Sequence, residues 1–163
     1  MTQRLRPEGL DFLATAPKRW EFAAHVAAPP ATVFSAISAD PSTWTWFPGL
    51  SAGRYEGGAP HGVGSVREVR MSRVTYRETI LAWDQDRRWA YRVDECTLPM
   101  AKALVEDWAT EERGDGTAVR WTFAIEPGLL FRIGMPLAPT VMGRLFRRAM
   151  ANLDAELRTR ERR

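Results

Sequence analysis

The stretch VAAPPATVFSAISADPSTWTWFPG, residues 26–49, decides the fold, because it leads from the end of a strand into two short helices. Apolar residues alternate through WEFAAHVAA, residues 20–28, with the period of a half-buried strand. A proline then suits the first turn of a helix, and Val33, Phe34 and Ile37 form its apolar stripe. We therefore predict a strand followed directly by a helix.

The aromatic end of this stretch predicts a second short helix. Asp40 can cap it, with Pro41 in the first turn, and a Pro-Gly pair ends it. At helical spacing Trp44 and Phe47 share one face and should pack the helix against the protein. Trp46 points elsewhere, so it is the better candidate to meet a ligand.

The chain that follows reads as a series of strands. Five segments alternate in polarity or are rich in β-branched and aromatic residues, and a further strand is expected near residues 51–56. Short turns join them, so consecutive strands must run antiparallel. The predicted product is a meander over residues 63–71, 73–83, 87–95, 102–112 and 116–126.

The end of the chain changes to a helical period, which predicts a long helix over about residues 138–160. Its opposite face carries arginines, for which we expect a solvated surface, with contact to nucleic acid or anionic lipid as the alternative. The apolar face needs a partner, and the sheet is the only large one available. That face holds Met142, Leu145, Phe146, Ala149, Leu153 and Leu157, and the arginines are Arg144, Arg147, Arg148 and Arg158.

Composition is that of a globular domain, with 45% hydrophobic and 26% charged residues in 163. The net charge of +3 comes from the region after residue 143, so it does not indicate a nucleic-acid groove. Cys96 is the only cysteine, which excludes an internal disulfide and a Cys-rich zinc site. The first 20 residues lack the apolar core of a signal peptide, and no stretch is long enough to span a bilayer, so we expect a cytoplasmic protein without stable membrane insertion.

The order of these elements resembles the helix-grip fold of the START/Bet v 1-like superfamily, and within it a bacterial SRPBCC protein of the polyketide cyclase/dehydrase type. The resemblance is carried by residues 26–49, by ETILAWDQDRRWAYRV and GTAVRWTFAIEP, and by the amphipathic end helix. It implies an α+β fold in which a curved antiparallel sheet of six to seven strands wraps on the long C-terminal helix, with an apolar cavity between them. Residues 1–19 would be an N-terminal extension and residues 20–163 a single domain.

Ionisable residues on the predicted strands are the candidates for catalysis. Glu106 shares a strand face with Leu104 and Trp108, and Asp107 has the opposite face, so whichever side turns inward brings a carboxylate with it. An inward carboxylate would sit beside an arginine or have a raised pKa, and the alternative is an outward, solvated ion pair. The catalytic candidates are Glu78, Glu106, Asp107 and Tyr91.

Metal and nucleophile chemistry find little support in the sequence. Neither His25 nor His61 has a His or Cys partner at metal-ligand spacing, so we expect His25 to be solvated and His61 to be a turn residue, and we expect no metal and no cofactor. Aromatic residues are the stronger signal, since they alternate on strands and recur on the helices. The expected ligand-binding residues are Phe34, Trp46, Phe47, Trp89, Tyr91, Trp121, Phe123 and Phe146.

Three functions remain open from the sequence. The first is binding of a small hydrophobic molecule, lipid-like or ring-containing, which requires a cavity of roughly 300 Å³ or more. The second is an enzyme resembling a polyketide cyclase, aromatase or dehydratase that uses the same cavity. The third is a protein-interaction module that uses the sheet or the basic helix, with a partner that the sequence does not name.

Overall fold

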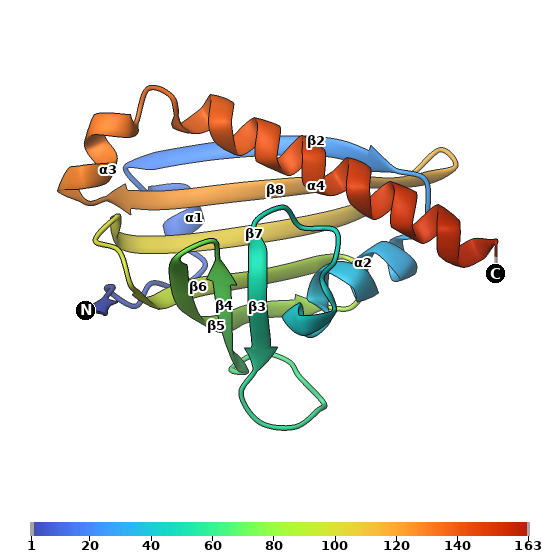
Figure 1. The fold of residues 1–163 in the computed structure, drawn as a ribbon, viewed down its shortest axis with the longest axis horizontal. Helices are drawn as coiled ribbons and strands as arrows, with labels where there is room; N and C mark the ends of the chain where they lie inside the picture. Colours follow the sequence, from blue (N-terminus) through green and yellow to red (C-terminus); the bar gives the residue numbers. More distant parts are fainter. Residues whose placement is uncertain (1, 163) are drawn as a thin grey trace.

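The structure is a computed structural model that describes residues 2–162, and it contains one curved antiparallel sheet (Figure 1). Seven strands are hydrogen-bonded in the order β2-β8-β7-β6-β5-β4-β3, and β1 pairs with β6. The predicted meander is therefore confirmed. The first long strand, β2, pairs with the last strand, β8, and forms one edge of the sheet. The strands are β1 (Gln3–Arg4), β2 (Lys18–Val26), β3 (Leu50–Tyr55), β4 (Val66–Met71), β5 (Val74–Asp84), β6 (Arg88–Cys96), β7 (Ala101–Arg113) and β8 (Gly116–Pro127).

The helix α4 (Ala138–Glu161) lies across one face of the sheet, beside β2 and β8 (Figure 1). Four of the six residues of its predicted apolar stripe are buried, with Phe146, Ala149 and Leu153 at 0% exposure, and the other two, Met142 and Leu145, are half-buried. Gly143 lies where the helix comes close to β2, because a Cβ there would be 3.1 Å from the ring of Phe22. The helix and the concave side of the sheet thus enclose the main hydrophobic core.

The two short helices after β2 are α2 (Pro30–Ser38) and the single 3-10 turn η1 (Pro41–Thr43). The side chain of Asp40 accepts a hydrogen bond from the backbone N–H of Ser42, so the predicted cap is confirmed. The turn η1 ends at Thr43, four residues earlier than expected. From Trp44 onward the segment is not helical. The helical spacing that we used to sort the three aromatic residues therefore does not apply.

Three elements were not predicted: β1, α1 (Phe12–Thr15) and α3 (Leu129–Gly134). Phe12 of α1 packs on the convex face of the sheet with Val105 and Ala124, so that face has a small apolar core of its own. The residues before β2 are thus packed onto the sheet, although the division of the chain at residue 20 stays a prediction. The short α3 lies at the end of the sheet and leads into α4 (Figure 1).

Candidate ligand-binding cavity

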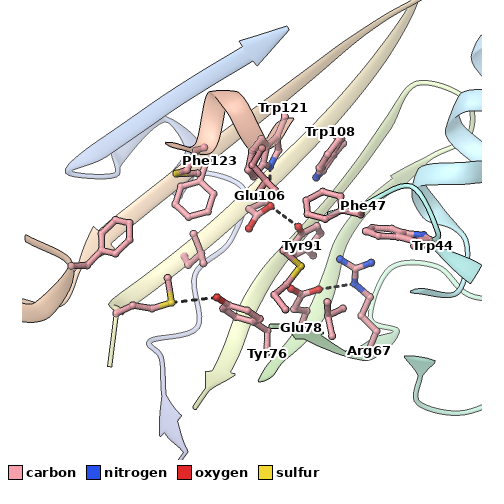
Figure 2. Close-up of a pocket in the computed structure, with 17 residues that line it drawn as sticks. Trp44, Phe47, Arg67, Tyr76, Glu78, Tyr91, Glu106, Trp108, Trp121 and Phe123 are labelled. Atoms are coloured by element: carbon pink, nitrogen blue, oxygen red, sulfur yellow. Dashed lines mark hydrogen bonds and ion pairs between the residues drawn. The ribbon is translucent and has the colours of Figure 1, made fainter. Parts of the chain in front are cut away.

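A cavity of about 220 Å³ lies between the concave face of the sheet, α3, the first turns of α4 and the segment that follows η1 (Figure 2). Its wall is mainly apolar and takes side chains from five strands. The lining residues are Trp44, Phe47, Arg67, Val69, Met71, Tyr76, Glu78, Tyr91, Met100, Leu104, Glu106, Trp108, Trp121, Phe123, Phe131, Met142 and Leu145.

One wall of the cavity is aromatic because neighbouring strands place rings opposite one another. Trp108 of β7 is paired in register with Trp121 of β8, and the two rings are nearly parallel with centroids 5.4 Å apart. Phe146 of α4 packs behind Trp121, with a centroid distance of 5.8 Å. This packing fixes the rings, and both tryptophans line the cavity, a suitable surface for an apolar molecule.

The first polar group in the wall is an ion pair between Arg67 of β4 and Glu78 of β5. Arg67 Nε donates to Glu78 Oε2 at 2.6 Å, and the two side chains are only 1% and 6% exposed. The guanidinium also lies over the rings of Trp89, Tyr91 and Trp44, at 4.4, 4.6 and 5.1 Å. Burial is the largest single influence on Arg67 and lowers its pKa, but the attraction of Glu78 together with Tyr91 and Tyr55 outweighs it, so the pKa of Arg67 is raised.

The second polar group is centred on Glu106 of β7. Its Oε2 accepts hydrogen bonds from the Tyr91 hydroxyl at 2.5 Å and from Trp121 Nε1 at 2.8 Å. Burial is the main reason that the pKa of Glu106 is raised to about 7, and the negative charge of Glu78 adds to the rise. Burial also raises the pKa of Tyr91 well above its ordinary value, so this hydroxyl remains a donor.

The two groups meet at Tyr91, whose ring face receives Arg67 and whose hydroxyl donates to Glu106 (Figure 2). Near neutral pH, Glu106 is present both with and without its proton, which is the condition for accepting and returning a proton. Among the described residues there is no cluster of three or more His, Cys, Asp or Glu side chains that could hold a metal ion. The chemistry available in the wall is therefore hydrogen bonding, one ion pair and one exchangeable proton.

Four of the eight expected ligand-binding residues line the cavity, namely Phe47, Tyr91, Trp121 and Phe123. The other four do not. Phe34 packs against Trp83 at a centroid distance of 6.0 Å, and Phe146 lies behind the aromatic wall. Trp89 is fully buried against Arg67 and Tyr91, so it supports the wall without forming it.

The fourth of these is Trp46, and its expected orientation was wrong. Trp44 and Phe47 line the cavity, whereas Trp46 borders a separate surface groove with Leu157 between α2 and the end of α4. The backbone carbonyl of Trp46 accepts a hydrogen bond from the side chain of Asn152 of α4, which fixes this segment to the helix. The physical reason is that η1 ends early, at Thr43. Side chains after it no longer rotate by the 100° per residue of a helix, which was the basis for the expected orientation of Trp46.

Of the four catalytic candidates, Glu78, Glu106 and Tyr91 line the cavity and Asp107 does not. Asp107 lies on the convex face and forms an ion pair with Arg88 at 2.6 Å. The two forms expected for an inward carboxylate are both present, since Glu78 sits beside an arginine and Glu106 has a raised pKa. His25 is about half exposed, and His61 stacks on Tyr55 in its turn.

Sequence reasoning missed the wall residues Arg67, Trp108 and Trp44. Arg67 could have been found from the turn between β4 and β5, because it lies opposite Glu78 at an equal distance from that turn. Trp108 could have been found in the same way, since it follows Glu106 by two residues and shares its face. No sequence signal identifies Trp44, because its position depends on an irregular segment.

Comparisons with known proteins agree with this geometry. Residues 19–158 match the model of the family described as polyketide cyclase / dehydrase and lipid transport. The chain belongs to this family. Uncharacterized proteins of Mycobacterium bovis and Mycobacterium tuberculosis are each 29% identical to it over 118 residues, which cover 71% of this chain and 70% of theirs.

Solved structures share the fold of this family member. A START superfamily protein from Mycobacterium smegmatis superposes with a TM-score of 0.72 at 12% identity, covering 86% of this chain and 97% of that one. The major latex-like protein 151 of Panax ginseng superposes with a TM-score of 0.69 at 15% identity, covering 85% and 96%. At these identities the likeness shows the fold alone, so the function must be argued from the cavity.

Proposed function

We propose that this protein binds a compact, mainly apolar, ring-containing molecule in the cavity between the sheet and α4. The observation that carries the proposal is a hollow with stacked tryptophans on its wall, at a place where a purely structural core would be filled. The membership of a family that includes lipid transport proteins supports it. Among the described residues no helix is long and apolar enough to cross a membrane. A cytoplasmic location remains a prediction.

The size of the cavity limits the ligand. Its volume of about 220 Å³ falls short of the roughly 300 Å³ that binding was expected to require. An apolar cavity of ~150 Å³ accommodates benzene. The present cavity therefore fits a molecule of one or two rings, and a long acyl chain would require the wall to move.

The proposal is tested by native mass spectrometry of the purified protein, followed by calorimetric titration with small ring compounds. We expect a retained small molecule or micromolar binding. Leu145 of α4 lines the cavity and is half-buried, so Leu145→Trp should fill the space and abolish binding. Val63→Trp adds the same side chain at a site that is 68% exposed, and it should bind as the wild type does. Equal binding by both variants would contradict a site in this cavity.

A second candidate function is acid/base catalysis on the bound molecule, which the pKa of Glu106 near 7 favours. Glu106 would take a proton from the carbon next to a ligand carbonyl, leaving an enolate, and then return it. The test is exchange of those protons for deuterium in D₂O, with 1-tetralone as substrate and NMR as the readout. The wild type should accelerate exchange and Glu106→Gln should not. Exchange at the buffer rate with the wild type would exclude this function for that substrate.

A further inference from the structure

Most of the exposed large apolar side chains of the protein gather at one end of the sheet. Within residues 2–162, six such side chains are exposed, and four of them lie in α3 and at the start of α4, where they are between 59% and 80% exposed. A fifth, Leu98, lies in the turn between β6 and β7 and borders a surface hollow together with Phe131 of α3. Figure 1 shows α3 and this turn at the same end of the sheet. The four are Leu129, Ile133, Leu137 and Val141.

These side chains are exposed because the opposite faces of both helices already pack on the protein. In α3, Phe131 lines the cavity, and Leu129 and Ile133, four residues apart, share the other side of the helix. In α4, Phe146 is buried in the core, and Val141, five residues earlier, points away from it by the ~100° turn of each residue. The sheet therefore cannot cover the exposed side chains, and a cluster of this kind marks an interaction surface.

The same segment carries positive charge without any negative charge. The sequence has four arginines and no acidic residue between Glu126 and Asp154, and all four arginines are exposed. None of them belongs to an ion pair within residues 2–162, whereas Arg158 and Arg160, farther along α4, each pair with a carboxylate one turn earlier. Their charge is therefore available to an outside partner. The four are Arg132, Arg144, Arg147 and Arg148.

Apolar and basic side chains share one face of α4. Four of them follow one another at intervals of four, three and four residues, which places them in a row along the helix: Leu137, Val141, Arg144 and Arg148. Such a face suits the surface of an anionic bilayer, where arginines meet lipid phosphates and aliphatic side chains reach the acyl boundary. A second copy of the chain fits less well, since a two-fold dimer through this face would bring the arginines of both copies together.

We propose that α3 and the first turns of α4 dock on anionic lipid bilayers. The docking surface consists of the four aliphatic side chains of α3 and α4, Leu98 and the four unpaired arginines. The contact is peripheral, because no helix within the described residues is long and apolar enough to cross a membrane. This inference goes beyond the proposed function and does not depend on it, since binding to a bilayer surface needs no ligand in the cavity.

The test is sedimentation of the full chain with vesicles of two compositions: phosphatidylcholine alone, and phosphatidylcholine with about one third phosphatidylglycerol. We expect binding to the anionic vesicles to be at least about tenfold stronger, since each arginine near such a surface contributes about fivefold. Added salt should weaken that binding. Equal binding to both kinds of vesicle, or no binding to the anionic ones, would overturn the inference.

A matched pair of variants tests the apolar side chains. Ile133→Glu places a negative charge within the docking surface and should weaken binding to the anionic vesicles about tenfold or more. Val63→Glu makes a comparable change at another exposed position, in the loop between β3 and β4, far from α3 in Figure 1, and should weaken binding less than about twofold. Equal weakening by both would show that only net charge matters and would overturn the inference.

A second pair tests the arginines, because each double variant removes two positive charges from exposed positions of α4. Arg144→Ala with Arg148→Ala should weaken binding about tenfold or more, and Arg158→Ala with Arg160→Ala less than about threefold. An equal or larger loss in the second double variant would overturn the inference. Light scattering measures the alternative: a wild-type dimer that Ile133→Glu dissociates, together with no binding to vesicles, would assign this surface to a second copy and overturn the inference.

Discussion

Adjacent residues of β7 show how differently the two faces of the sheet are built. Glu106 points to the concave face, where it accepts hydrogen bonds from the neutral donors of Tyr91 and Trp121 in the wall of the cavity. Asp107 points to the convex face, where it pairs with Arg88, and the side chains of Asp107 and Arg88 are 12% and 39% exposed. One strand thus presents a carboxyl group of raised pKa on one side and, on the other, a carboxyl group paired with a partly exposed arginine.

The difference extends to the rest of each face. The convex face is closed by α1 and by ion pairs, so its polar groups have partners that water can also reach. The concave face holds a cavity, and its wall keeps a buried ion pair and buried donor nitrogens without a hydrogen-bond partner. Such features are retained at functional sites, which is why we assign the function to the concave face. Each face of the sheet can therefore serve as a control for the other.

The largest effect should come from breaking the buried ion pair. Arg67→Met leaves Glu78 buried without its partner and should lower the free energy of unfolding by about 3–5 kcal/mol. Arg88→Met removes the corresponding arginine of the convex face, where Arg88 is 39% and Asp107 12% exposed, and should cost less, about 1–2 kcal/mol. Urea unfolding of both variants measures the difference. Equal losses would mean that the two faces do not differ in this way.

The next effect is the dependence of stability on pH. The pKa of Glu106 is raised to about 7 from 4.5, so between these values the folded protein holds a proton that the unfolded chain has released. Stability should therefore fall as the pH rises from about 4.5 to 7, by about 3 kcal/mol from this group. Glu106→Gln keeps an oxygen for both donors and should remove that fall.

Urea unfolding of the wild type and of Glu106→Gln at pH 5 and pH 8 measures this dependence. The advantage of the wild type over the variant should be larger at pH 5 than at pH 8. A gap that is constant with pH would show that Glu106 titrates near its ordinary pKa.

The smallest effect concerns the two tryptophans after η1. Trp44 lines the cavity and Trp46 does not, so Trp44→Phe should weaken the binding of a ring ligand a few-fold, while Trp46→Phe should not change it. Calorimetric titration with 1-tetralone compares the two. Weaker binding in the Trp46 variant alone would restore the orientation that the helical spacing predicted.

Regular elements were predictable from the sequence because their periods follow from backbone geometry. Alternation located the strands from β2 to β8, and the 3.6-residue period located the buried stripe of α4, including Phe146 and Leu153. The short elements β1, α1 and α3 have too few residues to show any period.

The site was only partly predictable, for two physical reasons. Alternation places Glu106 and Asp107 on opposite faces, but it does not say which face is concave, since that depends on where α4 packs. The orientation of Trp44 and Trp46 depends on an irregular segment fixed by Asn152 of α4, a contact 106 residues away in sequence. The unpartnered donor nitrogens of the wall residues Trp44, Arg67 and Trp108 can be found only when the partners of every buried atom are known.

A small ring ligand in the concave cavity would change the surroundings of the tryptophans that line it. The indole N–H signals of the protein therefore test directly whether a ligand binds there. The chain has seven tryptophans, of which Trp44, Trp108 and Trp121 line the cavity, whereas Trp83 lies outside it. In a ¹H–¹⁵N NMR titration with 1-tetralone, we expect large, saturable chemical-shift changes of those three signals and an unchanged Trp83 signal. Shifts centred on Trp83, or no saturable shift of Trp108 and Trp121, would contradict it.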